Sequence, residues 1–468
     1  MKEASYVLIR IRDAEKARAW LGSAPVTTAV EMNPPPSTAL QVAFTAAGLE
    51  ALGIPRSVIA GFSAEFVGGM TEDSRTRRLG DVNSNSPSEW AWGTGNRLPH
   101  LVAMFFAEPG LLHGFIQSTK GASWDQAFEE LRTLTTENLD GVEPFGFADG
   151  ISQPGIDWNE QRDHKAAQVT YTNVAALGEF LLGYRNEYNK YTDRPLLDAD
   201  ADSAGLLPAQ DAPEKKDLGR NGTYMVMRDL RQDVRAFWQF IDRQSGGNVE
   251  EREKLGAALV GRTRAGDPLV PVLGPKNEFT FERDQGGARC PFGAHVHRAN
   301  PRNADYPLHP TGLARLLTII GFGPREFRDD LMSPVRFHRV LRRGREYGPE
   351  LLPTDALEPG PDDEPSRGLH FICLNANISR QFEFLQNAWM MNTKFSGLSG
   401  ESDPLLGDRE SVPGCPATDG FTIPVDGGLP RRLSGVPQFV TVRGGAYFFL
   451  PSIRALHYFV KAGSSGPQ

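Results

Sequence analysis

One short run of the sequence gathers most of the side chains that can bind a metal or an anion. Residues 289–302 read RCPFGAHVHRANPR and contain one cysteine, two histidines, one asparagine and three arginines. Two prolines and one glycine predict a shaped loop or a short helical turn, because both residue types interrupt longer regular elements. This run is therefore the first candidate for a functional site.

His295 and His297 are the metal-ligand candidates of this run. Their spacing places both side chains on one face of a strand but separates them on a helix, so a metal pair requires an extended backbone. No third ligand stands at the spacing of a closed zinc site. A haem iron needs one axial imidazole, an acceptor for the other ring nitrogen and cations for the propionates, and Arg298 and Arg302 supply cations. These residues favour haem over zinc, although a short histidine motif is more often structural.

Two further runs place charged residues beside glycine. Residues 144–154, PFGFADGISQP, hold one carboxylate, Asp149, and residues 336–347, RFHRVLRRGREY, are an arginine cluster with a glycine turn. A carboxylate among small residues can approach a cofactor closely and act as base and then as acid. An arginine such as Arg342 stays charged and can stabilise the negative charge that develops as a bond breaks. Taken alone, such an aspartate is more often a turn residue and such an arginine part of a solvated face.

The composition is that of an acidic globular protein. With 468 residues, we expect two domains of about 200 residues each. The net charge of -8 and the pI near 5.7 argue against a nucleic-acid partner. The amino terminus lacks the pattern of a signal peptide, and no window reaches the ~20 apolar residues of a membrane span, so we expect a cytoplasmic protein with no membrane partner. Cys290, Cys373 and Cys415 match no CxxC pattern, which argues against a disulfide scaffold.

Strand and helix patterns alternate in the first half of the chain. Apolar periodicity predicts strands at residues 6–12, 40–44 and 100–106, and helices at residues 13–21, where Asp13 is the expected cap, 46–52 and 127–134. Residues 62–98 are rich in glycine, serine, asparagine and arginine, which predicts a long irregular segment. Residues 197–219 have the composition of a linker, and we place the domain boundary there.

The same pattern returns after the linker. Residues 224–241 again predict a strand and then a helix, and Tyr6 and Trp20 recur 218 positions later as Tyr224 and Trp238. Further strands are predicted at residues 369–374, 439–443 and 446–450, with a helix at residues 380–390. This order predicts an α+β fold of two ferredoxin-like sandwich domains with antiparallel sheets, residues 1–218 and 219–468. Two such domains face to face would leave a cleft between them.

The three chemically distinctive runs resemble the motifs of the dye-decolourising peroxidases. PFGFADGISQP is similar to the family's G-x-x-D-G signature, CPFGAHVHRANPR to its proximal-histidine motif and RVLRRGREYG to its distal-arginine motif. FTAAGLEALG, RNGTYMVMRDLRQDV and FVTVRGGAYFFLPS are further matches, and the long segments 62–98 and 344–368 resemble a larger, insertion-bearing branch. The resemblance implies two ferredoxin-like domains around one haem b per chain. It also implies a peroxidase that uses hydrogen peroxide to oxidise bulky phenolic or dye-like compounds by one-electron steps.

The resemblance gives individual residues a role. It puts His295 at the axial position on the iron, where the preceding Gly293 and Ala294 favour it over His297. Asp149 becomes the distal acid–base group and Arg342 the distal cation. The family often has a carboxylate bonded to the axial imidazole, and the candidates here are Glu383 and Asn377. The remaining cofactor contacts are expected at Gly150, Ile151, Ser152, Arg302, Leu369 and Phe371.

Other functions stay open on the sequence alone. A haem carrier or sensor with the same fold would not need Asp149 and Arg342, and a zinc hydrolase would use His295 and His297. For the peroxidase, we expect a small-molecule reductant and a monomer or homo-oligomer. Aromatic residues are usually core, but candidates for relaying electrons from bulky substrates are Trp90, Trp92, Trp158, Trp389 and Tyr347.

Overall fold

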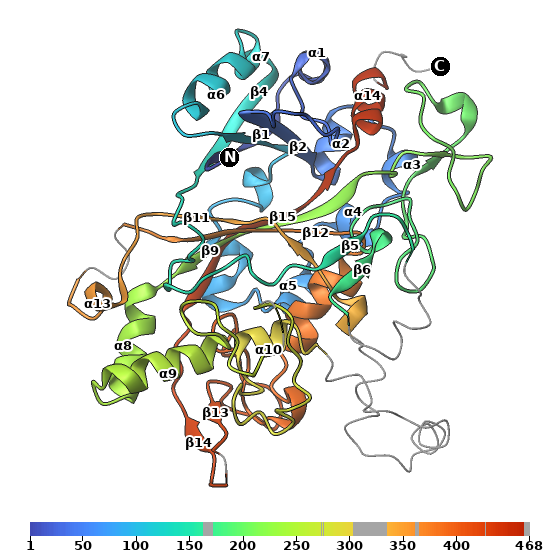
Figure 1. Cartoon of the computed structure of the whole chain (residues 1–468). Helices are drawn as coiled ribbons and strands as arrows, with labels where there is room; N and C mark the ends of the chain where they lie inside the picture. Colours follow the sequence, from blue (N-terminus) through green and yellow to red (C-terminus); the bar gives the residue numbers. More distant parts are fainter. Residues whose placement is uncertain are drawn as a thin grey trace, which may run out of the picture.

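One antiparallel sheet organises both halves of the molecule (Figure 1). The structure is a computed structural model, and it describes residues 1–161, 172–272, 274, 276–302, 335–360, 365–425 and 427–462. Within these residues nine strands form the sheet in the order β10-β12-β9-β15-β2-β3-β1-β4, with β11 also paired to β12. The order places strands from the two ends of the chain, β2 and β15, side by side.

The first half is a ferredoxin-like unit. Its elements are β1 (Glu3–Ile11), α1 (Ala14–Ser23), β2 (Thr38–Phe44), β3 (Leu101–Ala107), α6 (Leu112–Lys120) and β4 (Phe128–Thr135). The strands lie in the order β2-β3-β1-β4, and each neighbouring pair is antiparallel. Asp13 caps α1 as expected, because its side chain accepts a hydrogen bond from Lys16 N at 3.0 Å.

The helix predicted at residues 127–134 is wrong, because these residues form the strand β4. It pairs with β1 from Ile11 opposite Phe128 to Ser5 opposite Thr135. Its glutamates, leucines and arginine are good helix formers, but helix propensity is a weak preference that tertiary pairing overrides. The second helix of this half is α6, which packs on β3 and β1.

The second half repeats the unit. Its elements are β9 (Thr223–Gln232), α8 (Val234–Gln244), β10 (Leu341–Arg342), β11 (Arg345–Tyr347), β12 (Gly368–Asn375), the helical turns Ser379–Glu383 and Leu385–Met390, and β15 (Val440–Leu450). The order β10-β12-β9-β15 matches β2-β3-β1-β4 position by position. The predicted fold class, α+β with two ferredoxin-like units, is therefore confirmed.

β15 is one strand where the sequence predicted two. Its pairing with β9 shifts register between Val442 and Gly444, so a bulge takes the place of the expected turn. Gly444 is required there, because a Cβ at this position would lie 2.4 Å from Trp92 Nε1. The bulge thus gives room for a buried tryptophan from the segment 62–98.

The two halves meet edge to edge rather than face to face. Phe449 of β15 lies opposite Phe44 of β2. Both rings also contact Phe459 of α14 (Ile453–Lys461), at centroid distances of 6.3 and 5.6 Å. An apolar core therefore crosses the junction of the halves, and the domain limit after residue 218 stays a prediction.

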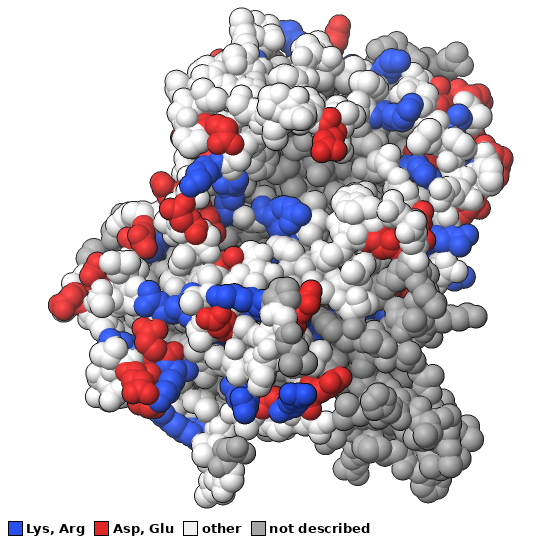
Figure 2. All heavy atoms as spheres, viewed as in Figure 1, with Lys and Arg blue, Asp and Glu red and all other residues white. Residues whose placement is uncertain are grey.

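Helices and loops cover the sheet of the second half. Figure 1 shows α8, α9 (Val249–Val260) and α10 (His295–Ala299) on one side of β9, β12 and β15. The segment 62–98 also contributes short helices, including α5 (Asp73–Leu79). Acidic and basic side chains are interspersed over the face drawn in Figure 2. None of the helices among the described residues has the length and apolar character needed to span a bilayer.

Candidate active site

The three chemically distinctive runs meet around one cavity. It has a volume of about 290 Å³ and lies between the loop of residues 143–154, α10 and the strands β9, β12 and β15. Asp149, His295 and Arg342, one from each run, line it. Other predicted cofactor contacts that line the cavity are Ile151, Ser152, Leu369 and Phe371.

Asp149 and Arg342 form an ion pair on the cavity wall. Arg342 Nη1 lies 2.9 Å from Asp149 Oδ1, and the two side chains are 30% and 28% exposed. Burial alone would raise the pKa of Asp149, but the Arg342 guanidinium, the Gly150 amide and His295 outweigh it and hold this pKa below its ordinary value. Asp149 is therefore a carboxylate, able to accept a proton near neutral pH.

A side chain from the same loop fixes the backbone of this pair. Gln153 Oε1 accepts a hydrogen bond from Arg342 N at 3.1 Å, and Gln153 Nε2 donates one to Arg342 O at 3.2 Å. On its other side, Arg342 lies opposite Cys373 where β10 pairs with β12. Gly150 has a φ of 78°, which favours glycine, and it is exposed, so it shapes the turn after Asp149 rather than a wall of the cavity.

His295 stands at the first position of α10 and is held by a buried carboxylate. Its Nδ1 lies 3.0 Å from Asp403 Oδ2, and Asp403 Oδ1 also accepts hydrogen bonds from Leu405 N at 2.9 Å and Leu406 N at 2.8 Å. Burial would lower the pKa of His295, but the Asp403 carboxylate reverses the shift and raises it. Burial would raise the pKa of Asp403, and His295 holds it below its ordinary value. The imidazole is thus fixed in one orientation, with its Nδ1 occupied.

The prediction that Glu383 or Asn377 contacts the imidazole is wrong, since Asp403 does so. Glu383 is 1% exposed and accepts hydrogen bonds from Arg75 Nε at 3.1 Å and Tyr447 Oη at 2.9 Å. Asn377 Oδ1 accepts one from Arg380 N at 2.8 Å. Asp403 follows the histidine by 108 positions and belongs to none of the three runs, so their patterns could not indicate it.

His297 has a structural place. It is 1% exposed, its ring stacks on Phe281 at 3.8 Å and its Nδ1 donates a hydrogen bond to Cys290 O at 3.2 Å. Burial lowers the pKa of His297 to about 4, so the ring is neutral. Because both histidines lie on the helix α10, their side chains diverge, and the extended backbone required for a metal pair is not formed.

Comparison with known proteins identifies peroxidases as relatives of the chain. No protein-family model matches the chain. The chain is 31% identical over 341 residues to the multifunctional dye peroxidase DyP2 of Amycolatopsis sp.. This alignment covers 69% of the chain and 62% of DyP2. It is 27% identical over 458 residues to the dye-decolorizing peroxidase msp1 of Mycetinis scorodonius, and this alignment covers 90% of the chain and 76% of msp1. The chain is therefore similar over most of its length to members of the dye-decolourising peroxidase family.

Solved structures of this family share the fold of the chain. A dye-decolorizing peroxidase in complex with 2,6-dimethoxyphenol matches with a TM-score of 0.70 and 23% identity, over 98% of this chain and 96% of that chain. An ancestral D-type dye decolorizing peroxidase matches with a TM-score of 0.68 and 25% identity, over 97% and 95%. The chain spans less than two thirds of the length of DyP2. The family is one of oxidoreductases.

One arginine of the predicted site, Arg302, lies elsewhere than predicted. Arg302 is fully buried and donates hydrogen bonds to Asn277 O and Asn277 Oδ1, both at 2.9 Å, so it supports a loop behind the cavity. Arg262 and Arg339 line the cavity instead. Arg262 Nη2 donates to Ser152 Oγ at 2.9 Å, and burial lowers the pKa of Arg262 to about 10. Arg262 follows α9 in the stretch GRTRAG, residues 261–266. This stretch matches no motif, so the sequence did not indicate that Arg262 lines the cavity.

The walls of the cavity are apolar. Leu369 and Phe371, separated by one residue on β12, both face it, as their period-two spacing predicted. Other apolar residues of the lining include Phe145, Phe147, Leu230, Val296, Val335, Phe382, Leu385, Trp389, Met390, Leu405 and Leu406. Of the aromatic residues considered as electron relays, Trp389 is in this lining, Trp90 and Trp92 are buried in the core, and Trp158 is 65% exposed.

Proposed function

We propose that this chain is a haem peroxidase that uses hydrogen peroxide to oxidise bulky phenolic or dye-like compounds by one-electron steps. The observation that carries the proposal is a single cavity that holds the Asp149–Arg342 ion pair together with His295, whose ring is fixed by Asp403. The relationship to peroxidases that act on dyes, and the likeness to a solved complex with 2,6-dimethoxyphenol, support the substrate class.

The residues of the cavity fit haem b. Because Asp403 occupies Nδ1 of His295, Nε2 is the nitrogen left to bind an iron. Apolar walls that include Leu369 and Phe371 suit a flat macrocycle, and the guanidinium of Arg262 suits a propionate. When bound, the haem supplies an iron that takes up the oxidising equivalents of the peroxide. One His295 site implies one iron per chain.

Asp149 and Arg342 have different roles in cleaving the peroxide: Asp149 transfers the proton, and Arg342 stabilises the developing charge. A peroxide loses a proton from one oxygen and gains a proton on the oxygen that leaves, so one carboxylate can accept the proton and then return it. Its lowered pKa keeps Asp149 in the accepting form. Arg342, 2.9 Å away, stays charged and stabilises the negative charge that develops on the leaving oxygen.

The other candidate functions gain no support from the described residues. A haem carrier or sensor would use His295 and the apolar walls but would not require an acid–base pair beside them. A zinc hydrolase would require His297 in the site, and this ring packs on Phe281. No cluster of three or more potential metal-binding side chains exists among the residues that the structure describes.

Absorption spectra of the purified protein test the proposal. We expect a Soret band, and a rapid change of that band on mixing with one equivalent of hydrogen peroxide. Asp149→Asn should slow the change by about a hundredfold or more, and Arg342→Ala by a similar factor, while the haem stays bound. Asp140→Asn, at an exposed ion pair with Lys2, is the matched control and should react at the normal rate. Full rates in both site variants would remove the roles assigned here.

The partners of the reaction are hydrogen peroxide and a small-molecule reductant. A monomeric or homo-oligomeric state and a cytoplasmic location stay predictions from the sequence.

A further inference from the structure

His338 is a second imidazole on the wall of the cavity, and the proposed mechanism does not use it. It belongs to the arginine cluster of residues 336–347 and follows the turn Val335–Phe337. The side chain is 5% exposed and contributes to the lining that also includes Asp149, His295 and Arg342.

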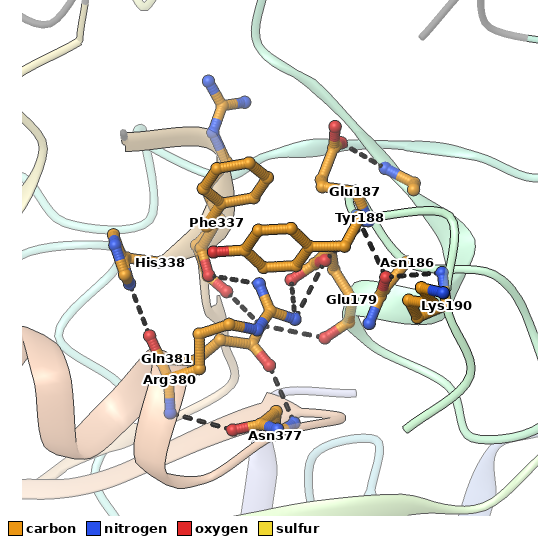
Figure 3. Close-up of polar contacts among 12 residues, drawn as sticks. Glu179, Asn186, Glu187, Tyr188, Lys190, Phe337, His338, Asn377, Arg380 and Gln381 are labelled. Carbon is orange, nitrogen blue, oxygen red and sulfur yellow. Dashed lines mark hydrogen bonds and ion pairs between the residues drawn. The ribbon is translucent and has the colours of Figure 1, made fainter. Parts of the chain in front are cut away.

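One ring nitrogen of His338 is committed to the backbone. Nδ1 contacts the carbonyl oxygen of Arg380, and because a carbonyl only accepts, Nδ1 carries the proton (Figure 3). This carbonyl is held in place, since Arg380 Nη1 donates to Phe337 O at 2.6 Å and Arg380 Nη2 pairs with Glu179 Oε2 at 2.8 Å. A neutral ring protonated on Nδ1 has a bare lone pair on Nε2.

The ring cannot turn to find another partner. It stacks on Phe384 at 3.6 Å with an angle of 8° between the planes, and it meets the edge of Trp389 at 5.4 Å. Nε2 is buried and has no hydrogen-bond partner among the described residues. A buried polar atom without a partner is uncommon in native proteins and is a mark of a site for a ligand, an ion or water.

Arg380 is the charged residue that acts most directly on His338, and Glu179 pairs with it. Arg336 and Arg339 lie on its own segment, and Arg339 lines the cavity as well. Arg380 and Glu179 lie on the neighbouring elements, where they neutralise each other as an ion pair. Burial lowers the pKa of His338 to about 4, so this corner presents a neutral acceptor beside guanidinium groups.

A carboxyl group suits this corner better than other ligands. A carboxyl group together with one proton satisfies the lone pair of Nε2, and its negative charge is favoured by Arg339. A phenolic hydroxyl would satisfy Nε2 but would gain nothing from the arginines. A bare metal cation would be repelled by them.

We propose that His338 Nε2 binds a propionate of the haem and shares one proton with it, so that haem binding takes up a proton at this corner. This inference rests on the proposed function, because the haem supplies the carboxyl group. It assigns His338 to holding and orienting the macrocycle rather than to the reaction with peroxide.

The test compares haemin with haemin dimethyl ester, which lacks both carboxylates. The full chain, produced without haem, is titrated with each compound and the Soret band gives the two affinities. His338→Phe keeps an aromatic ring without a nitrogen, and His338→Asn keeps a donor for the Arg380 carbonyl without the Nε2 acceptor. The wild type should bind haemin more tightly than the ester, and the ratio of the two affinities should fall by about tenfold in both variants. The reason is that each variant loses a hydrogen bond to a charged group, which is stronger than one between neutral groups. His297→Phe, which alters a buried histidine outside the lining, should leave the preference unchanged.

The pH dependence gives a second readout that does not depend on activity. If a proton is taken up, the affinity of the wild type for haemin falls as the pH rises, and the fall should be shallower in both His338 variants. An unchanged preference for haemin in the two variants would overturn the inference about His338. It would leave the proposed function standing, because a Soret band would still show haem binding. A low-spin spectrum in the wild type that becomes high-spin in the variants would also overturn it, since Nε2 would then bind the iron. Absence of any Soret band in the wild type would reject the proposed function itself.

Discussion

Gln153 holds Arg342 by both of its backbone polar groups, as a neighbouring strand would. Its amide oxygen accepts from Arg342 N at 3.1 Å, and its amide nitrogen donates to Arg342 O at 3.2 Å. Gln153 lies four residues after Asp149, so one short loop carries the carboxylate and also fixes the arginine paired with it. The distance between Asp149 and Arg342 therefore depends on a side chain that touches neither of their charged groups.

Replacing Gln153 by alanine should loosen the Asp149–Arg342 pair. Two hydrogen bonds are lost, which lowers the free energy of unfolding by about 1–3 kcal/mol. The rate of the peroxide-dependent Soret change should fall while haem affinity changes less, because the loss acts on the geometry of the pair. Stopped-flow spectra and urea unfolding measure the two effects. Gln126→Ala, at an exposed position, is the control, and equal rates in the Gln153 and Gln126 variants would contradict the positioning role.

The pH profile of the peroxide reaction should report on Asp149. Its pKa is held below the ordinary value, so the carboxylate stays ionised and the rate should stay high until the pH falls below the usual carboxyl range. Arg342→Lys keeps a positive charge beside Asp149. Arg342→Ala removes this charge, so burial, which raises the pKa of Asp149, is opposed less strongly. The acid limb should therefore move to higher pH in Arg342→Ala and less in Arg342→Lys. An acid limb at the same pH in all three proteins would exclude Asp149 as the titrating group.

Asp403→Asn tests the carboxylate that the structure places on His295. The Asp403 side chain is fully buried, whereas His295 is 28% exposed. Removing one partner of a buried ion pair costs about 3–5 kcal/mol. The folded-state pKa of Asp403 is lowered, so its contribution to stability is present above the unfolded pKa and lost as the pH falls through the folded value. The difference in unfolding free energy between wild type and variant should thus be large at pH 7 and shrink in acid.

The same variant should alter the electronic properties of bound haem. An imidazole bonded to a carboxylate is a stronger donor, so Asp403→Asn should raise the reduction potential of the iron. Glu383→Gln is the matched comparison, because it removes a buried carboxylate that contacts Arg75 and Tyr447 rather than His295. Spectroelectrochemical titration gives both potentials. A larger shift in Glu383→Gln than in Asp403→Asn would contradict the contact seen here.

Local sequence patterns predicted the residues whose role depends on short spacing. Leu369 and Phe371 point into the cavity because alternate residues of a strand share a face. The repeat of strand and helix patterns predicted two similar units, which the matching strand orders confirm. The prediction failed at β4, where helix-forming residues pair with β1 because the sheet provides an open edge.

Residues brought in from a distance could not be predicted in the same way. Asp403 is adjacent to His295 only because the chain between Met390 and Leu405 folds back, where Asp403 N donates to Met390 O at 2.8 Å. Arg302 belongs to the predicted run, but its side chain turns to the carbonyls of residues 277 and 279. The run of residues 289–302 thus fixes the place of one imidazole, while the contacts of its other charged residues follow from tertiary packing.

Glu143 should make the stability of the protein depend on pH around neutrality. Its carboxylate accepts hydrogen bonds from Phe145 N and Phe147 N, both at 3.0 Å, and from Gln232 Nε2 at 2.7 Å, so it shapes the turn that precedes Asp149. Burial nevertheless raises the pKa of Glu143 to about 7, with a smaller contribution in the same direction from Asp149. A folded-state pKa above the unfolded one means that stability is fully present below the unfolded pKa and is lost as the pH rises through about 7.

Urea unfolding of the wild type and Glu143→Gln between pH 5 and pH 8 measures this contribution. The wild type should lose up to about 3 kcal/mol that the variant does not lose, because glutamine cannot ionise. Glutamine also offers one acceptor oxygen instead of two, so the variant should be less stable than the wild type at pH 5, and the gap should narrow or reverse at pH 8. Glu15→Gln, at an exposed position of α1, should show the wild-type dependence. A gap between wild type and Glu143→Gln that is constant across this range would show that Glu143 titrates elsewhere.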